Sequence, residues 1–225
     1  MKGKIMIRTR FIVGAVLAVA GLLSTTTAAA QAAEFSPYPP SQKQTTSAVR
    51  FERSPELTAY LDKLNPSQRA EFIGTNLPST STVTTDQKPD NAAAAASVST
   101  ASSTGNAVTP LAVGCWTGRV DWTVRAAAGN GLYSYYHVGR WCSNGSSVTS
   151  ASIADKGAQT YTVGWRYAGV TASGSGVVSN QGRSYTQHKF ILGVGGWDVD
   201  TRLECGRVRG QSTGGYLYDT TCGIY

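Results

Sequence analysis

The sequence predicts an all-β fold, an antiparallel sandwich or barrel of about seven strands stapled by two hairpin disulfides. Three observations lead to this fold class. The 225 residues include 25 Gly and 11 Tyr, and only 15% are charged, below the roughly 25% of an ordinary soluble protein. All four Cys and all five Trp follow Val113. Short stretches of alternating apolar and polar residues in this part are separated by Gly-rich turns, as in small β domains.

The first predicted element is a secretory signal peptide over residues 1–32. Four basic residues precede an apolar run of 13 residues, Phe11 to Leu23, and small residues follow up to Ala33. Basic, apolar and small segments in this order are typical of a signal peptide, and the run is shorter than the roughly 20 residues of a membrane-spanning helix. We therefore expect a secreted, extracellular protein with no membrane span.

The charge left after this segment is small. Without the four leading basic residues, 16 Lys and Arg face 13 Asp and Glu. This excess is too small to indicate a nucleic-acid partner, and we expect none.

Residues 33–53 are expected to be disordered, and residues 54–74 to form a short helical hairpin. Ser54-Pro55-Glu56 combines an N-cap, a proline at the first helical position and an acid in the first turn. Apolar residues then recur at helical spacing up to Leu64, and Asn65-Pro66 starts a second helix that ends at Gly74. Two interpretations stay open: a weakly ordered segment before a linker, and a pro-segment or docking module that packs on the C-terminal domain.

Residues 75–112 are expected to be a disordered linker. Of these 38 residues, 22 are Ser, Thr or Ala, which bury too little apolar surface to offset the entropy of ordering the chain. The β domain is therefore placed at residues 113–225.

The cysteines set the register of the first hairpin in this domain. If Cys115 lies opposite Cys142, all cross-strand partners have numbers that sum to 257. One face of the hairpin then carries His137 and the aromatic residues Trp116, Trp122, Tyr133, Tyr135 and Trp141, while the other face is mostly polar. The aromatic face is either the core or an exposed platform for sugar rings, because both use the same residues.

A second hairpin disulfide is expected between Cys205 and Cys222, in a register that pairs Arg207 with Thr220. Further strands are expected at residues 147–153, 160–167, 184–192 and 197–203. The Gly-rich stretch 169–182 is expected to be a mobile loop or a poorly packed hairpin.

Three segments resemble small secreted β domains of actinobacteria that are mostly uncharacterised. They are Gly-Cys-Trp-Thr-Gly-Arg-Val at 114–120, Trp-Cys-x-x-Gly-x-x-Val-Thr-Ser at 141–150 and Thr-Gln-His-Lys-Phe at 186–190. The resemblance covers only residues 113–225 and implies a secreted β domain, with no catalytic residues to transfer.

No catalytic residue, cofactor or metal site is predicted. Only two His occur, and the four Cys are better explained by disulfides than by zinc binding. Asp198 and Asp200 are expected on one strand face about 6–7 Å apart, as an acid–base pair, part of a calcium site or a solvated charged face. His137 is either a packed residue or a proton-transfer group.

Arg119 and Arg140 are expected to contact an anionic polymer or only to aid solubility. The candidate ligand-binding residues are therefore Trp122, Tyr135, His137, Arg119, Arg140, Asp198 and Asp200.

The predicted function is that of a monomeric, non-catalytic binding domain that acts at the cell envelope on a cell-wall polymer or another extracellular protein. Abundant aromatic residues and Arg favour it, since these side chains supply most binding energy at interfaces. The alternatives are a secreted toxin, antimicrobial or inhibitor with a pro-segment, a hydrolase that uses Asp198 and Asp200 or His137, and a purely structural surface protein.

Overall fold

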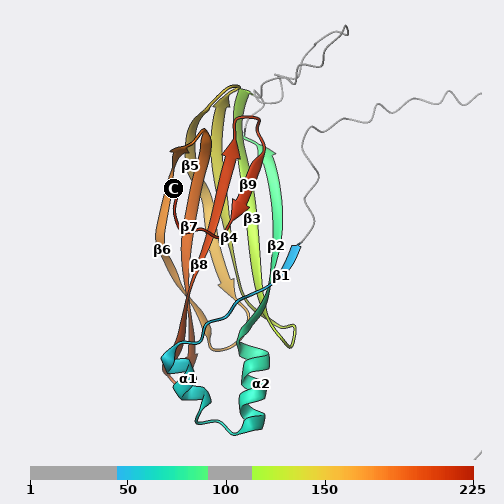
Figure 1. Ribbon diagram of the computed structural model, residues 1–225, viewed down its shortest axis with the longest axis vertical. Coiled ribbons are helices and arrows are strands. Elements are labelled where there is room, and N and C mark those ends of the chain that lie inside the picture. Colours follow the sequence, from blue (N-terminus) through green and yellow to red (C-terminus); the bar gives the residue numbers. More distant parts are fainter. Residues whose placement is uncertain (1–44, 91–112) are drawn as a thin grey trace, which may run out of the picture. The chain divides into compact units, whose positions relative to one another are not determined.

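A computed structural model describes residues 45–90 and 113–225 (Figure 1). The predicted signal peptide, the segment 33–44 and the later part of the predicted linker, 91–112, lie outside these residues. Within them the chain is mostly β, with nine strands in two antiparallel sheets and two short helices. None of the described helices is long and apolar enough to cross a membrane.

Sheet A has five strands and sheet B has four. The order in sheet A is β1 (Thr45–Ala48), β2 (Pro78–Pro89), β3 (Val113–Ala126), β4 (Gly131–Asn144) and β5 (Val148–Thr160). The order in sheet B is β6 (Trp165–Val178), β7 (Gln181–Val194), β8 (Trp197–Gln211) and β9 (Tyr216–Asp219). Consecutive strands are neighbours throughout, except that the chain changes sheet between β5 and β6.

The predicted register of the first hairpin is confirmed. Cys115 pairs with Cys142 and Val124 with Tyr133, so the sum of 257 holds from one end of the hairpin to the start of its turn. The Cys115–Cys142 and Cys205–Cys222 disulfides are both present.

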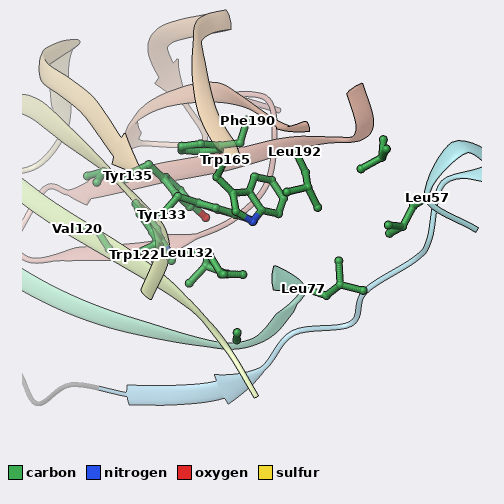
Figure 2. Close-up of a cluster of buried hydrophobic side chains, with 14 of the residues drawn as sticks. Leu57, Leu77, Val120, Trp122, Leu132, Tyr133, Tyr135, Trp165, Phe190 and Leu192 are labelled. Carbon is green, nitrogen blue, oxygen red and sulfur yellow. The ribbon is translucent and has the colours of Figure 1, made fainter. Parts of the chain in front are cut away.

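The aromatic face of this hairpin is the core of the sandwich rather than an exposed platform. Trp116, Trp122, Tyr133, Tyr135 and Trp141 are all buried. Tyr133 stacks on Phe190 of sheet B with 4.2 Å between ring centroids, and Figure 2 shows Phe190, Trp165 and Leu192 grouped with Tyr133 and Tyr135.

Glycines in β8 let the large rings of sheet A approach the backbone of sheet B. A Cβ atom added to Gly210 would lie 2.1 Å from the Trp141 ring, and one added to Gly206 would lie 2.5 Å from the Trp122 ring. Only a residue without a side chain fits at either position.

Both predicted helices are present and pack on the sandwich. Helix α1 (Pro55–Leu61) is capped by the Ser54 side chain, and α2 (Pro66–Asn76) begins with a capping box formed by Asn65 and Gln68. Leu57 and Leu61 of α1 are buried in the same core cluster as the sheet residues. The segment is therefore part of the folded unit, as the docking interpretation requires.

Polar contacts hold the helical segment to the end of the sandwich where β8 begins. The Ser54 hydroxyl donates to the Val199 carbonyl at 2.8 Å, and the Trp165 indole N–H donates to the Asn76 carbonyl at 3.0 Å.

The predicted linker is wrong over residues 78–89, which form β2. This strand pairs with β3 along its length, from Pro78 opposite Ala126 to Pro89 opposite Trp116. The predicted disorder of 33–53 is likewise wrong at residues 45–48, which form β1 against β2.

Two further findings concern β5 and β6. The predicted strand 160–167 contains a turn at residues 161–164, where Gly164 has a φ of +98°. Of the two alternatives for 169–182, the structure has the hairpin rather than the mobile loop: β6 continues to Val178, with register shifts on both sides of Val170, and turns through Ser179 and Asn180, both with positive φ, into β7.

The predicted register of the last hairpin is wrong by one residue. Arg207 pairs with Asp219 rather than with Thr220, and β9 ends at that residue. Cys222 therefore lies beyond the strand, and its disulfide ties the C-terminal segment 220–225 to β8 instead of joining two paired strands.

Candidate functional site

Three of the predicted ligand-binding residues lie in the core. Trp122 and Tyr135 are buried and stack with 5.1 Å between ring centroids and 8° between ring planes. His137 is fully buried between the sheets. These residues stabilise the fold and are not accessible to a ligand in this structure.

His137 belongs to a buried chain of hydrogen bonds that crosses the core. Its Nε2 is bonded to the Ser184 hydroxyl at 2.8 Å and its Nδ1 to the Thr186 hydroxyl at 3.1 Å. The Thr186 hydroxyl is also bonded to His188 Nε2 at 3.1 Å, and His188 Nδ1 is bonded to the Tyr167 hydroxyl at 3.0 Å. The two imidazoles therefore have partners on both ring nitrogens, which offsets the cost of burying them.

The surroundings keep both imidazoles neutral near pH 7. Burial, the neighbouring His188 and the nearby Lys156 lower the pKa of His137 from 6.5 to about 4. Burial and Lys156 lower the pKa of His188 to about 4 as well. Neither group is poised to exchange a proton at neutral pH, so the packed interpretation of His137 fits the structure better than proton transfer.

A half-buried carboxyl group lies near these residues. Glu204 pairs with His188 in the register of β7 and β8, and its Oε1 accepts a hydrogen bond of 2.7 Å from the Tyr133 hydroxyl. Burial raises the pKa of Glu204.

Asp198 and Asp200 do not share a face. A β-bulge places Asp198 opposite Gly193 and Asp200 opposite Leu192, so the two side chains point to opposite sides of sheet B. The exposed fraction is 52% for the Asp198 side chain and 3% for that of Asp200. The expected paired carboxylates are therefore separated, and no group of three or more metal-ligating side chains occurs in the described part of the chain.

Each of these carboxylates has its own arginine. Asp198 accepts two hydrogen bonds from Arg166, at 2.6 and 2.5 Å, and these bonds lower its pKa. Asp200 accepts from Arg202 at 2.9 Å. Arg202 also donates to the Glu52 carbonyl at 2.6 Å and stacks on the Phe51 ring at 3.7 Å, so Asp200 helps to hold the segment that leads into α1.

Arg119 and Arg140 lie on the outer face of sheet A, and both are paired. Arg119 donates two hydrogen bonds to Asp121, at 2.8 and 2.6 Å, and its guanidinium lies 3.7 Å from the centre of the Tyr136 ring. Arg140 donates to Asp90. Their charges are therefore balanced by neighbouring carboxylates.

The most exposed large apolar residues of the strand-connecting turns lie where sequence analysis did not place a site. Val163, in the β5–β6 turn, is 95% exposed, and Trp197, at the start of β8, is 78% exposed. A hydrogen bond of 2.8 Å from the Gly193 amide to the Gly164 carbonyl joins the end of β7, just before the second turn, to the first turn. We call Val163, Arg166, Trp197 and Asp198 the turn surface.

Glycine turns and an ion pair position the turn surface. Gly195 and Gly196 both have positive φ, 58° and 87°, in the two-residue turn before Trp197. The Arg166–Asp198 pair joins β6 to β8 across the end of β7. The sequence did contain one signal for this site, since a large aromatic directly after a Gly-Gly hairpin turn has little means of reaching the core.

Comparison of the chain with models of known protein families, with curated proteins and with solved structures finds no match.

Proposed function

We propose that the protein is a secreted, non-catalytic binding domain that acts at the cell envelope and uses the turn surface to contact its ligand. The observation that carries this proposal is the exposure of Trp197 directly after the Gly195–Gly196 turn. An exposed tryptophan forgoes the stabilisation that burial of its large ring would give the fold. Exposed aromatic residues of this kind are typical contributors to binding.

The arrangement of the turn surface suits a contact of modest size. Trp197 and Val163 supply exposed apolar area, and the Arg166–Asp198 pair supplies charged groups at the same end of sheet B. Glycine turns and a backbone hydrogen bond define the backbone here, and the Arg166–Asp198 pair already orders two of the side chains, which lowers the entropy lost on binding.

Two features support an extracellular setting. The two disulfides are typical of proteins that fold in an oxidising compartment, and the first 32 residues have the pattern of a signal peptide. The ligand class that we propose is an insoluble envelope polymer, with an extracellular protein as the alternative.

Retention on insoluble cell-wall material from an actinobacterium tests this proposal. Truncation of a central aromatic contact costs about 2 kcal/mol or more, so W197A is expected to weaken retention about 30-fold. Y225A is the matched control, because Tyr225 is an equally accessible aromatic, 91% exposed, outside the turn surface.

Two outcomes would refute this proposal. Equal retention of W197A and Y225A would refute the turn surface as the contact. Hydrolysis of the wall material by the wild-type protein would refute a non-catalytic role.

A further inference from the structure

The two outer faces of the sandwich differ in charge. On sheet A, four basic and four acidic side chains face outward or flank the strands, and the exposed Lys88 pairs with Asp86 at 3.2 Å in addition to the two arginine pairs described above. The residues are Lys88, Arg119, Arg125, Arg140, Asp86, Asp90, Asp121 and Asp155. Sheet A is therefore neutral on its outer side.

Sheet B is basic on its outer side. Five basic side chains face outward with only two carboxylates among the described residues, which leaves three positive charges. The residues are Arg166, Arg183, Lys189, Arg207, Arg209, Asp198 and Asp219. We call Arg183, Lys189 and Arg209, which have no carboxylate of their own, the basic face.

Two of these charges are held directly opposite each other. Arg183 of β7 pairs with Arg209 of β8 in the strand register, and like charges in such positions repel. Asp219 is the nearest carboxylate, but it accepts two hydrogen bonds of 2.9 Å from Arg207. The Arg209 Nε lies 3.1 Å from the same carboxylate without an aligned hydrogen bond, so this buried donor has no partner among the described residues.

The C-terminal segment contacts two of the guanidinium groups on this side of sheet B. Arg207 donates to the Gly223 carbonyl at 3.1 Å, and Arg183 donates to the Ile224 carbonyl at 3.0 Å. The Cys205–Cys222 disulfide ties this segment down, and the C-terminus marked in Figure 1 lies beside β6 and β7. The Ile224 carbonyl carries no net charge, so it positions Arg183 without neutralising it. The one charged acceptor in this segment is the Tyr225 carboxylate, which accepts from Arg207 at 3.4 Å, outside the basic face.

Resting on the proposed envelope function, we propose that the basic face binds a phosphodiester-linked polymer of the envelope. Arginine forks are suited to phosphate oxygens, which they bind through two parallel hydrogen bonds. Lys189 lies six residues along β7 from Arg183, roughly 20 Å at the rise of a strand, so the charges form a row that fits a chain better than a single ion. The exposed Leu203 and Leu217 beside the row offer apolar contacts to the units between phosphates.

Titration with purified poly(glycerol phosphate) at increasing salt tests this inference. Each ion pair contributes about 0.7 to the slope of log affinity against log salt concentration, so three pairs predict an affinity loss of about 20-fold between 50 and 200 mM salt. In R183Q/R209Q one pair is left, and the loss is expected to fall to about threefold. R50Q/R53Q is the matched control, because it removes the same charge from exposed positions outside the sheets and is expected to behave like the wild-type protein.

Several outcomes would overturn the inference. They are no binding of the wild-type protein, a salt slope near zero, equal loss in the two double variants, and binding of polygalacturonate as tightly as poly(glycerol phosphate). If R183Q/R209Q does not fold, two measurements still test the inference: the salt slope of the wild-type protein and that of R183K/R209K. The lysine variant keeps both charges, so its affinity should depend on salt as steeply as that of the wild-type protein.

The same assay separates this inference from the proposed function. W197A should bind soluble poly(glycerol phosphate) like the wild-type protein, because the turn surface is not part of the basic face. Normal polymer binding together with unchanged wall retention of W197A would refute the turn surface alone. Loss of wall retention in W197A with no polymer binding by the wild-type protein would refute the basic face alone.

Discussion

Acidification should destabilise the protein through its two buried histidines. The folded state keeps His137 and His188 neutral, with a pKa of about 4 for each, while the unfolded chain binds protons at the ordinary value of 6.5. Between these values the unfolded state holds more protons, so the free energy of unfolding falls as the pH falls. This contribution is fully present above about pH 6.5 and is lost as the pH approaches 4.

The size of the effect follows from these two values. From pH 7 to pH 4.5, each histidine is expected to remove about 2 kcal/mol from the free energy of unfolding, and the two together about 4 kcal/mol. Glu204 acts in the opposite direction, because burial raises its folded pKa and its contribution is largest at low pH. Asp198 and Asp219 have lowered pKa values, so their contributions are lost only at still lower pH.

Urea unfolding at pH 7, 6, 5 and 4.5 measures this dependence. H188Q removes one titrating group while its amide can still donate and accept, so the variant should lose about half of the pH dependence. E204Q should steepen the dependence, since it removes the opposing group. A change below about 1 kcal/mol in the wild-type protein, or an unchanged slope in H188Q, would show that the histidines are not responsible.

The remaining predictions concern packing and covalent links. G210A should lower the free energy of unfolding by about 1–3 kcal/mol or more, because its Cβ would overlap the Trp141 ring, whereas G74A, with no atom within 4 Å, should be neutral or stabilising in the same thermal melts. The double Cys205→Ser/Cys222→Ser variant should lower the free energy of unfolding by about 3 kcal/mol and show faster amide exchange in the C-terminal segment. Unchanged exchange there would contradict the conclusion that this disulfide holds the segment to β8. A chain cut at a protease site inserted between the two described ranges should still elute as one complex, since β2 pairs along its whole length with β3; separation of the fragments without denaturant would contradict this.

Sequence patterns predicted the first hairpin in detail because its two faces differ strongly. A shift of one residue would have moved Trp122 and Tyr135 to the solvent side, so a single register satisfied both the aromatic face and the cysteine pair. The last hairpin had no such contrast. Its outer and inner positions mix Arg, Tyr and Leu, and the assumption that Cys205 and Cys222 are paired strand residues led to a register that is wrong by one residue.

Strand β2 was missed because the composition was averaged over the whole predicted linker, residues 75–112. Ser, Thr and Ala were counted together as poor core formers, but residues 78–89 contain four Thr and one Val, whose branched Cβ atoms favour strands. Alanine runs of the kind found at 92–96 carry no such preference. Separating the β-branched residues would have divided the predicted linker near Pro89.

The candidate site was predictable only in part. The aromatic face favoured a packed His137, one of its two interpretations, but did not exclude it as a ligand-binding residue. The separation of Asp198 from Asp200 depends on a bulge that periodicity does not reveal. The turn surface was missed for a related reason. Tyr161, Val163 and Trp165 alternate like strand residues, although Gly164 reverses the chain between two of them.

The attachment of α1 to β8 also bears on the order in which the parts of the protein fold. Ser54 and Val199 are joined by a hydrogen bond across 145 residues of chain, while the β3–β4 hairpin closes within a few residues. Contacts that close long loops form late and slow the overall reaction, so folding is expected to begin in local hairpins and to take milliseconds to seconds. Until β8 is in place, Leu57 and Leu61 have no sheet to cover, and the chain exposes apolar surface during that interval. The fold therefore depends on its own last strands to protect its first helices.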